Sequence, residues 1–172
     1  MKVYYLTPSI DYELSSMGLK KILEKVSIMF FEKYKNRGDI PIIFNHCDIL
    51  NKNGIEAIPI VIDNRFGMNL DWFYHDTAAQ RMGRDFIYNI CDDDVLICPS
   101  TMCSAISLFS KGKKFLFVQN YSKYSIGSAE VYNYDGIITL KGYCEDYIKQ
   151  YTKVPVYSVL NGIDLKLYNC KV

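Results

Sequence analysis

Residues 153–168 read KVPVYSVLNGIDLKLY, and this stretch decides the fold. The apolar run 156–160 predicts a short buried strand. Asn161 and Gly162 end this run, because both residue types adopt positive φ readily and therefore favour a sharp turn. Short apolar runs of the same kind recur along the chain before this point, each followed by a turn or a polar loop.

These runs alternate with segments of helical period. The predicted strands are 2–6, 55–62, 95–98, 114–118, 136–140 and 156–160. The predicted helical segments are 16–37, 41–53, about 76–90, 101–109, 129–133 and 141–151. This alternation predicts an α/β fold with a Rossmann-like, doubly wound, mainly parallel sheet of about six strands and helices on both faces. No linker or repeat interrupts the pattern, so we expect a single domain over residues 1–172.

Composition excludes several classes of protein. A hydrophobic content of 49% and a charged content of 23% are ordinary for a soluble globular domain. A net charge of +1 argues against nucleic acid as a partner, because such proteins carry a broad basic field. None of the six cysteines forms a C-x-x-C pair, which indicates reduced, mostly buried thiols. With no signal peptide and no membrane-length apolar run, we expect a cytoplasmic protein.

One predicted helix is basic and amphipathic. It is expected to begin at Ser16 and to end at Arg37, with six basic and two acidic residues between 18 and 37. Two interpretations stay open. Its apolar side packs on the core and its lysines face solvent, or the helix makes a peripheral contact with an anionic inner membrane face or a lipid-linked acceptor.

The acidic run 92–94 and the two histidines are candidate metal ligands by residue type. Asp92 and Asp94 imitate the D-x-D element with which GT-A-fold glycosyltransferases hold a divalent metal. An apolar strand follows the run at once, so we expect a solvated turn at the amino-terminal edge of the sheet. His46 and His75 have no partner at metal-ligand spacing, and we predict that His46 is structural and that the chain has no metal site.

Two segments resemble one enzyme family. The strand and turn of residues 156–168, with the pattern N-G-I-D-x-x-x-Y, resemble the turn that closes the first domain in GT-B-fold glycosyltransferases of family four. The segment from Leu50 to Gly54 and the strand after it resemble the family's L-x-x-x-G-h-x-V signature, where h is apolar. The resemblance implies an N-terminal, acceptor-side domain of an enzyme that moves a sugar to a glycan or lipid-linked acceptor. It implies a nucleotide-sugar as co-substrate and no other cofactor.

The resemblance also implies a set of substrate-binding residues. In open parallel sheets, ligands bind beyond the carboxyl ends of the strands. Gly38 occupies the place of the family's phosphate-binding turn, although a glycine that only separates two helices is the plainer interpretation. The family often has a histidine after the strand 114–118, where this chain resembles the Q-[DN]-Y run of rhamnosyltransferase-like members. The implied residues are Gly38, Gln119, Asn120, Tyr121, Asn161, Gly162 and Asp164; no catalytic residue is identified.

A GT-B active site is the gap between two domains, and closure of that gap excludes water. We therefore expect an acceptor-side half whose donor-binding C-terminal domain is absent, and no sugar transfer by residues 1–172 alone. One alternative is a non-catalytic Rossmann-like binding or scaffold module, which tight nucleotide-sugar binding by this chain would favour. Another is a small GT-A-like transferase that uses Asp92 and Asp94, which metal-dependent turnover would favour.

Overall fold

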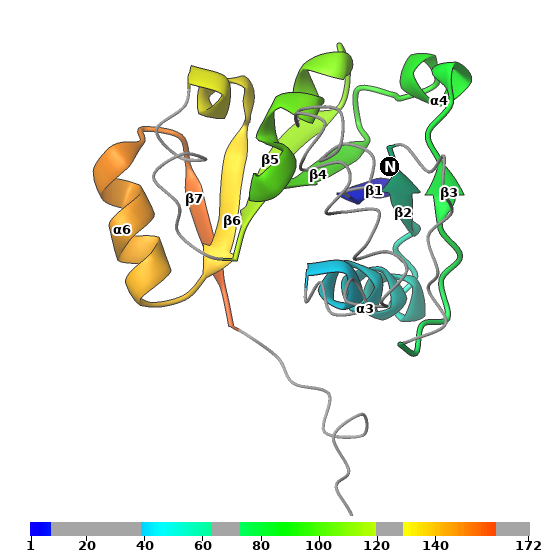
Figure 1. Cartoon of the computed structure of the whole chain (residues 1–172), viewed down its shortest axis with the longest axis horizontal. Coiled ribbons are helices and arrows are strands. Elements are labelled where there is room, and N and C mark those ends of the chain that lie inside the picture. The colour runs from blue at the N-terminus through cyan, green and yellow to red at the C-terminus, as the bar shows by residue number, and fades with distance from the viewer. Residues whose placement is uncertain (8–38, 63–72, 120–128, 161–172) are drawn as a thin grey trace, which may run out of the picture.

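The computed structural model describes residues 1–7, 39–62, 73–119 and 129–160 (Figure 1). These residues form one seven-stranded sheet in the order β3-β2-β1-β4-β5-β6-β7, and every pair of neighbouring strands is parallel. The predicted α/β, Rossmann-like architecture is confirmed, with one strand more than expected. No helix in the described ranges is both long enough and apolar enough to cross a membrane.

The elements follow the labels of Figure 1. The strands are β1 Val3–Thr7, β2 Ala57–Val61, β3 Gln80–Arg81, β4 Val95–Pro99, β5 Lys113–Val118, β6 Gly136–Leu140 and β7 Val156–Val159. The helices are α3 Asp39–Lys52, α4 Arg84–Tyr88 and α6 Tyr143–Tyr151, with 3₁₀ segments η1 Ser100–Leu108 and η2 Ala129–Asn133. Six strands and four helical segments therefore lie close to their predicted positions.

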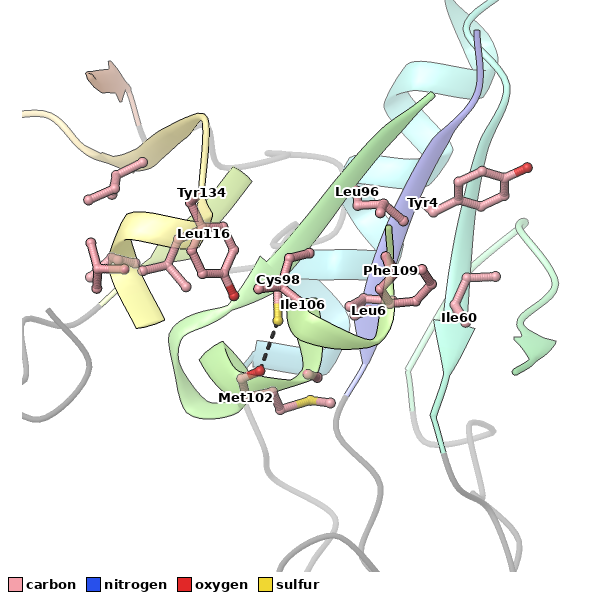
Figure 2. Close-up of a cluster of buried hydrophobic side chains, with 14 of the residues drawn as sticks. Tyr4, Leu6, Ile60, Leu96, Cys98, Met102, Ile106, Phe109, Leu116 and Tyr134 are labelled. Atoms are coloured by element: carbon pink, nitrogen blue, oxygen red, sulfur yellow. Dashed lines mark hydrogen bonds between the residues drawn. The ribbon is translucent and has the colours of Figure 1, made fainter. Parts of the chain in front are cut away.

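Side chains alternate between the two faces of the sheet, and each face has its own core. On β1, Tyr4 and Leu6 join one buried cluster while Val3 and Tyr5 join the other. The first cluster packs against α4, η1, η2 and α6, and Figure 2 shows its centre. The second cluster packs against α3. Each large aliphatic or aromatic side chain that is fully buried contributes about 1.5–3 kcal/mol to folding, so these two layers hold the central strands of the sheet in place.

The segment 76–90 differs from its prediction. In place of one long helix it forms an extended stretch, the two-residue strand β3 and the short helix α4. β3 pairs with Ile60 and Val61 at the edge of the sheet. Gly83, the residue before α4, is also extended, so the helix begins only at Arg84. Pairing with β2 therefore overrides the local helical period, and the helix shrinks to Arg84–Tyr88.

β7 is a strand, as predicted, but the prediction that it is buried is wrong. It is the last strand of the sheet and pairs only with β6. Tyr157 is 54% exposed, Val159 is 40% exposed and Leu160 is 79% exposed. An apolar run gives the same sequence pattern at the edge of a sheet as at its centre. The exposure of β7 therefore comes from its place at the edge, which the sequence pattern does not show.

The free thiols are less buried than predicted. Cys47 and Cys98 are buried, and Cys98 donates its Sγ–H to the carbonyl of Met102 at 3.1 Å. Cys103 and Cys144 are half-buried, and Cys91 is exposed in the turn before β4. Burial raises the pKa of both Cys47 and Cys98 to about 12, so these two thiols stay protonated and act as small apolar groups.

Candidate functional site at the carboxyl edge of the sheet

The carboxyl ends of all seven strands meet at one edge, and this edge contains a topological switch point. From β1 the chain proceeds to β2 on one side, while β4, β5, β6 and β7 follow on the other. The two halves of the sheet therefore diverge between the ends of β1 and β4. Open α/β sheets bind ligands in the crevice at such a point, because the connections on either side of it run to opposite faces.

Two buried threonines tie neighbouring strands together at this edge. Thr7, the last residue of β1, donates its hydroxyl to the carbonyl of Ile60 on β2 at 2.9 Å. Thr139, on β6, donates its hydroxyl to the carbonyl of Val118 on β5 at 3.0 Å. Both threonines are 0% exposed. These bonds make the strand ends a rigid base, which is the kind of support that a precise binding site requires.

Gln119 is the predicted site residue that the structure describes. It follows β5 directly, and its backbone carbonyl accepts a weak Sγ–H bond from Cys144 on α6 at 4.0 Å. Its side-chain Nε2 is buried and has no hydrogen-bond partner among the described residues. Leaving a buried donor without a partner costs about 1–3 kcal/mol, so such a group is rare in folded proteins.

The other predicted site residues lie outside the described residues: Gly38, Asn120, Tyr121, Asn161, Gly162 and Asp164. The same holds for the predicted helix between Ser16 and Arg37. The described strands still show where the chain enters these segments. β5 and β7 are both parallel neighbours of β6, so Gln119 and Leu160 follow strands that end at the same edge of the sheet.

The acidic run lies at the opposite edge, as predicted. Residues 92–94 precede β4, and Asp93 pairs with the amino group of Met1 at 3.1 Å, which lowers the pKa of that carboxyl. The prediction that this turn is solvated is wrong for Asp94, whose side chain is 5% exposed. Its carboxylate accepts hydrogen bonds from the backbone N–H groups of Lys2, at 2.8 Å, and Cys91, at 3.0 Å. Its carboxylate therefore braces the start of β1 and β4. Within the described ranges, no group of three His, Cys, Asp or Glu side chains is arranged to hold a metal.

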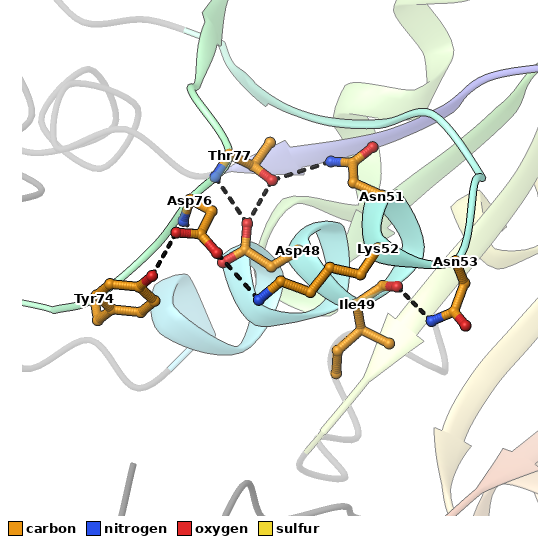
Figure 3. Close-up of polar contacts among 8 residues, drawn as sticks. All are labelled: Asp48, Ile49, Asn51, Lys52, Asn53, Tyr74, Asp76 and Thr77. Carbon is orange, nitrogen blue, oxygen red and sulfur yellow. Dashed lines mark hydrogen bonds and ion pairs between the residues drawn. The ribbon is translucent and has the colours of Figure 1, made fainter. Parts of the chain in front are cut away.

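A second polar cluster lies beside α3 (Figure 3). Asp48 is 7% exposed and accepts hydrogen bonds from the backbone N–H groups of Asp76 and Thr77, at 3.0 and 2.8 Å, and from the Thr77 hydroxyl. The Tyr74 hydroxyl and Lys52 both bind Asp76 and lower the pKa of that carboxyl. The bonds to Asp48 tie the bend at Asp76 and Thr77, which precedes β3, to α3. The cluster lies toward the C-terminal half of α3, away from the carboxyl edge of the sheet. Sequence analysis missed it because Asp76 and Thr77 lie 28 and 29 residues after Asp48 in the chain.

A groove separates α3 from the part of the sheet that the helix does not cover. This α3 groove has a volume of about 410 Å³, and Tyr5, Asn45, His46, Phe117, Ile138 and Val159 are among the residues that line it. The His46 ring contacts Tyr5 and Phe117 at centroid distances of 5.7 and 5.4 Å. His46, predicted to be structural, therefore does contact the core, but it also lines the wall of an open site.

The carboxyl edge thus combines a switch point, two buried threonine hydroxyls that link neighbouring strands, and an amide donor that has no partner among the described residues. These features suit the recognition of a polar, uncharged group, because an amide offers donors and an acceptor but no charge. They identify no acid, base or nucleophile within the described residues. No protein-family model, curated protein or solved structure shows a significant match to this chain.

Proposed function

We propose that this chain is the acceptor-side domain of a nucleotide-sugar-dependent glycosyltransferase that moves a sugar to a glycan or lipid-linked acceptor. Two features support the proposal. The segment 156–168 resembles the turn of GT-B-fold enzymes, and the all-parallel sheet has the architecture on which such a domain is built. The observation that carries it is Nε2 of Gln119 at the carboxyl end of β5, which is buried and has no hydrogen-bond partner among the described residues.

A glutamine in this position suits a sugar hydroxyl. A hydroxyl both donates and accepts hydrogen bonds, and the Gln119 amide offers two N–H donors and one carbonyl acceptor to match it. The amide does not ionise near neutral pH and is neither an acid nor a base, so its role is to bind and orient the acceptor. Holding the acceptor hydroxyl against an activated sugar lowers the entropic part of the barrier, which is the contribution that positioning makes to group transfer.

The proposal assigns the two substrates to different walls of the cleft. The acceptor contacts this domain, and the nucleotide-sugar contacts a second domain that closes on it and excludes water. Nucleotide-sugar affinity of this chain is therefore expected to be weak. A standalone Rossmann-like binding module would show the opposite preference, since its own switch point would hold the nucleotide.

Calorimetry on the chain tests this assignment. One series uses methyl glycosides of rhamnose, glucose and galactose, and the other uses the corresponding nucleotide-sugars. We expect at least one glycoside to bind with a Kd on the order of 1 mM, which is about 4 kcal/mol. Gln119→Met should abolish this binding. Gln80→Met is the matched control, because Gln80 is an exposed glutamine on β3 and its loss should leave binding unchanged.

The opposite pattern would refute the proposal. Micromolar binding of a nucleotide-sugar, together with no binding of any glycoside, would assign the chain to the class of binding modules. Glycoside binding that survives Gln119→Met would remove Gln119 from the site and leave the proposal without its main support.

A further inference from the structure

The α3 groove lies on a face of the sheet, and the proposed acceptor site at the carboxyl edge does not use it. Among the described elements, α3 packs mainly on β1 and β2 and lies beside the same face of β5, β6 and β7 (Figure 1). Side chains alternate between the two faces of these strands, so every second side chain lies on the face of the sheet that carries α3. Phe117, Ile138, Leu140 and Val159 therefore form the floor of the groove. This floor is an apolar surface that crosses three strands.

Part of the groove lining is polar but uncharged, and we call it the polar wall: Tyr5 on β1 and Asn45 and His46 on α3, beside Ile42, Ile49 and Leu50 of the same helix. The Tyr5 hydroxyl, the Asn45 amide and the His46 imidazole all line the groove, and none makes a hydrogen bond within the part of the chain that the structure describes. Asp, Glu, Lys and Arg are absent from the described residues of the lining. Three polar side chains that converge on an apolar cavity without partners of their own are typical of a small-molecule site.

Burial sets the protonation of these groups. It lowers the pKa of His46 below its ordinary value and raises the pKa of Tyr5. His46 is therefore neutral near pH 7, with one ring nitrogen as a donor and the other as an acceptor, and Tyr5 keeps its proton. The polar wall thus offers hydrogen bonds of both kinds, and the described residues of the groove carry no charge to balance an ionised ligand.

We propose that the α3 groove binds an uncharged amphiphile, a hydrocarbon chain that ends in a hydroxyl or amide group. The hydrocarbon lies on Phe117, Ile138, Leu140 and Val159, across two inter-strand steps of about 4.8 Å each. The end group reaches the polar wall formed by Tyr5, Asn45 and His46. A volume of about 410 Å³ falls within the range of about 300–1,000 Å³ that small-molecule sites occupy. This inference does not depend on the proposed glycosyltransferase function.

The head group is uncharged for an energetic reason. Moving an ionised carboxylate or ammonium from water into an apolar site is costly unless an opposite charge or several hydrogen bonds compensate it. The described lining supplies hydrogen bonds but no opposite charge. A neutral head group loses less hydration, and its hydroxyl or amide replaces that hydration with bonds to Tyr5 and His46.

The probes are 1-decanol, decanoate and decylamine, which share a chain length and differ in charge. Each is titrated below its aggregation threshold into the full chain, and binding is followed by the amide resonances of ¹⁵N-labelled protein. We expect saturable decanol binding with one site per chain, and affinity on the order of tenfold higher than that of either charged analogue. Equal affinity for decanoate, or no saturable binding of decanol, would overturn the proposal.

Three variants locate the site. Val159→Trp adds bulk on the exposed edge strand, narrows the groove and should abolish decanol binding. Decanol binding of unchanged affinity in this variant would also overturn the proposal. Tyr5→Phe keeps the ring, removes the hydroxyl and should weaken binding by about three- to tenfold. Tyr4→Phe is the matched control, because Tyr4 neighbours Tyr5 on β1 but belongs to the cluster on the opposite face. Equal weakening by both tyrosine variants would contradict the assignment of the Tyr5 hydroxyl to the head group.

Discussion

Replacing Gln119 by methionine is expected to stabilise the free domain and to abolish binding at the proposed acceptor site. Nε2 of Gln119 is buried without a hydrogen-bond partner among the described residues. The desolvation of one such donor costs about 1–3 kcal/mol. Methionine has a similar length and carries no strong polar group, so the folded state loses this penalty and should gain about 1–2 kcal/mol in its free energy of unfolding.

Asn51 is the matched amide with the opposite expectation. Its Nδ2 donates to the carbonyl of Ala57 at 2.8 Å and to the Thr77 hydroxyl at 3.0 Å, and its Oδ1 accepts from the Ala57 N–H at 2.8 Å. Asn51→Leu leaves these groups without partners and should reduce the free energy of unfolding by about 1–3 kcal/mol. One amide therefore destabilises the free fold and the other stabilises it, and the two substitutions should have opposite signs.

Urea denaturation followed by circular dichroism measures both changes, because the midpoint shifts with stability while the slope stays constant. In a thermal scan, 1 kcal/mol corresponds to about 2–4 °C for a chain of this size. If Gln119→Met lowers the free energy of unfolding by more than about 0.5 kcal/mol, the amide has a partner in the free protein and the reasoning fails. Equal signs for the two variants would refute it as well.

Three further predictions concern the framework. Asp48→Ala removes the acceptor of three donors and should cost about 2–4 kcal/mol in urea denaturation, with faster hydrogen exchange at the Thr77 amide. Because the pKa of His46 in the folded chain lies below its ordinary value of 6.5, the unfolded chain takes up this proton first. The free energy of unfolding should therefore decrease as the pH falls through 6.5, and His46→Gln should remove that part of the slope. Gly112 has a φ of +83°, and an added Cβ would lie 3.1 Å from Ile90 Cγ2. Gly54 has a φ of +77°, but an added Cβ there would meet open space. Gly112→Ala should therefore lower the melting temperature more than Gly54→Ala, and calorimetry compares the two variants.

Each of these predictions has a contradicting result. An Asp48→Ala variant as stable as the unmutated chain would show that the cluster beside α3 contributes nothing to the fold. A pH slope that persists in His46→Gln would assign the titration to another group. Equal melting temperatures for Gly112→Ala and Gly54→Ala would mean that neighbours of Gly112 yield without strain, so that only the shared positive φ matters.

Most of the sheet follows from local sequence. The ends of β1, β2, β4, β5, β6 and β7 lie within two residues of the predicted ends, because each is a short apolar run bounded by turn residues. β3 was missed for a physical reason. Gln80 and Arg81 are exposed and polar, and they form a strand because β2 offers an edge and Asp48 ties the preceding bend at Asp76 and Thr77 to α3. Neither cause is visible in a window of neighbouring residues.

The candidate site was predictable in part. Gln119 comes directly after a predicted strand, and the parallel direction of the strands places it at the edge where ligands bind. That its amide lacks a partner depends on side chains packed from distant segments. The α3 groove has the same origin, since it exists because α3 covers β1 and β2 but not β6 and β7. The amphipathic period of residues 41–53 gave no sign of it.

The central claim is that the carboxyl edge of the sheet, with Gln119, receives an uncharged sugar acceptor. Its most direct test is the ¹H–¹⁵N spectrum of the labelled chain during titration with the methyl glycoside that binds best. The account predicts a shift of the Gln119 side-chain amide and of backbone amides at Thr7 and Ser100, with no change at Lys2 or Asp94 on the opposite edge. A Gln119 amide that stays unmoved at saturation, or shifts confined to Lys2 and Asp94, would contradict it.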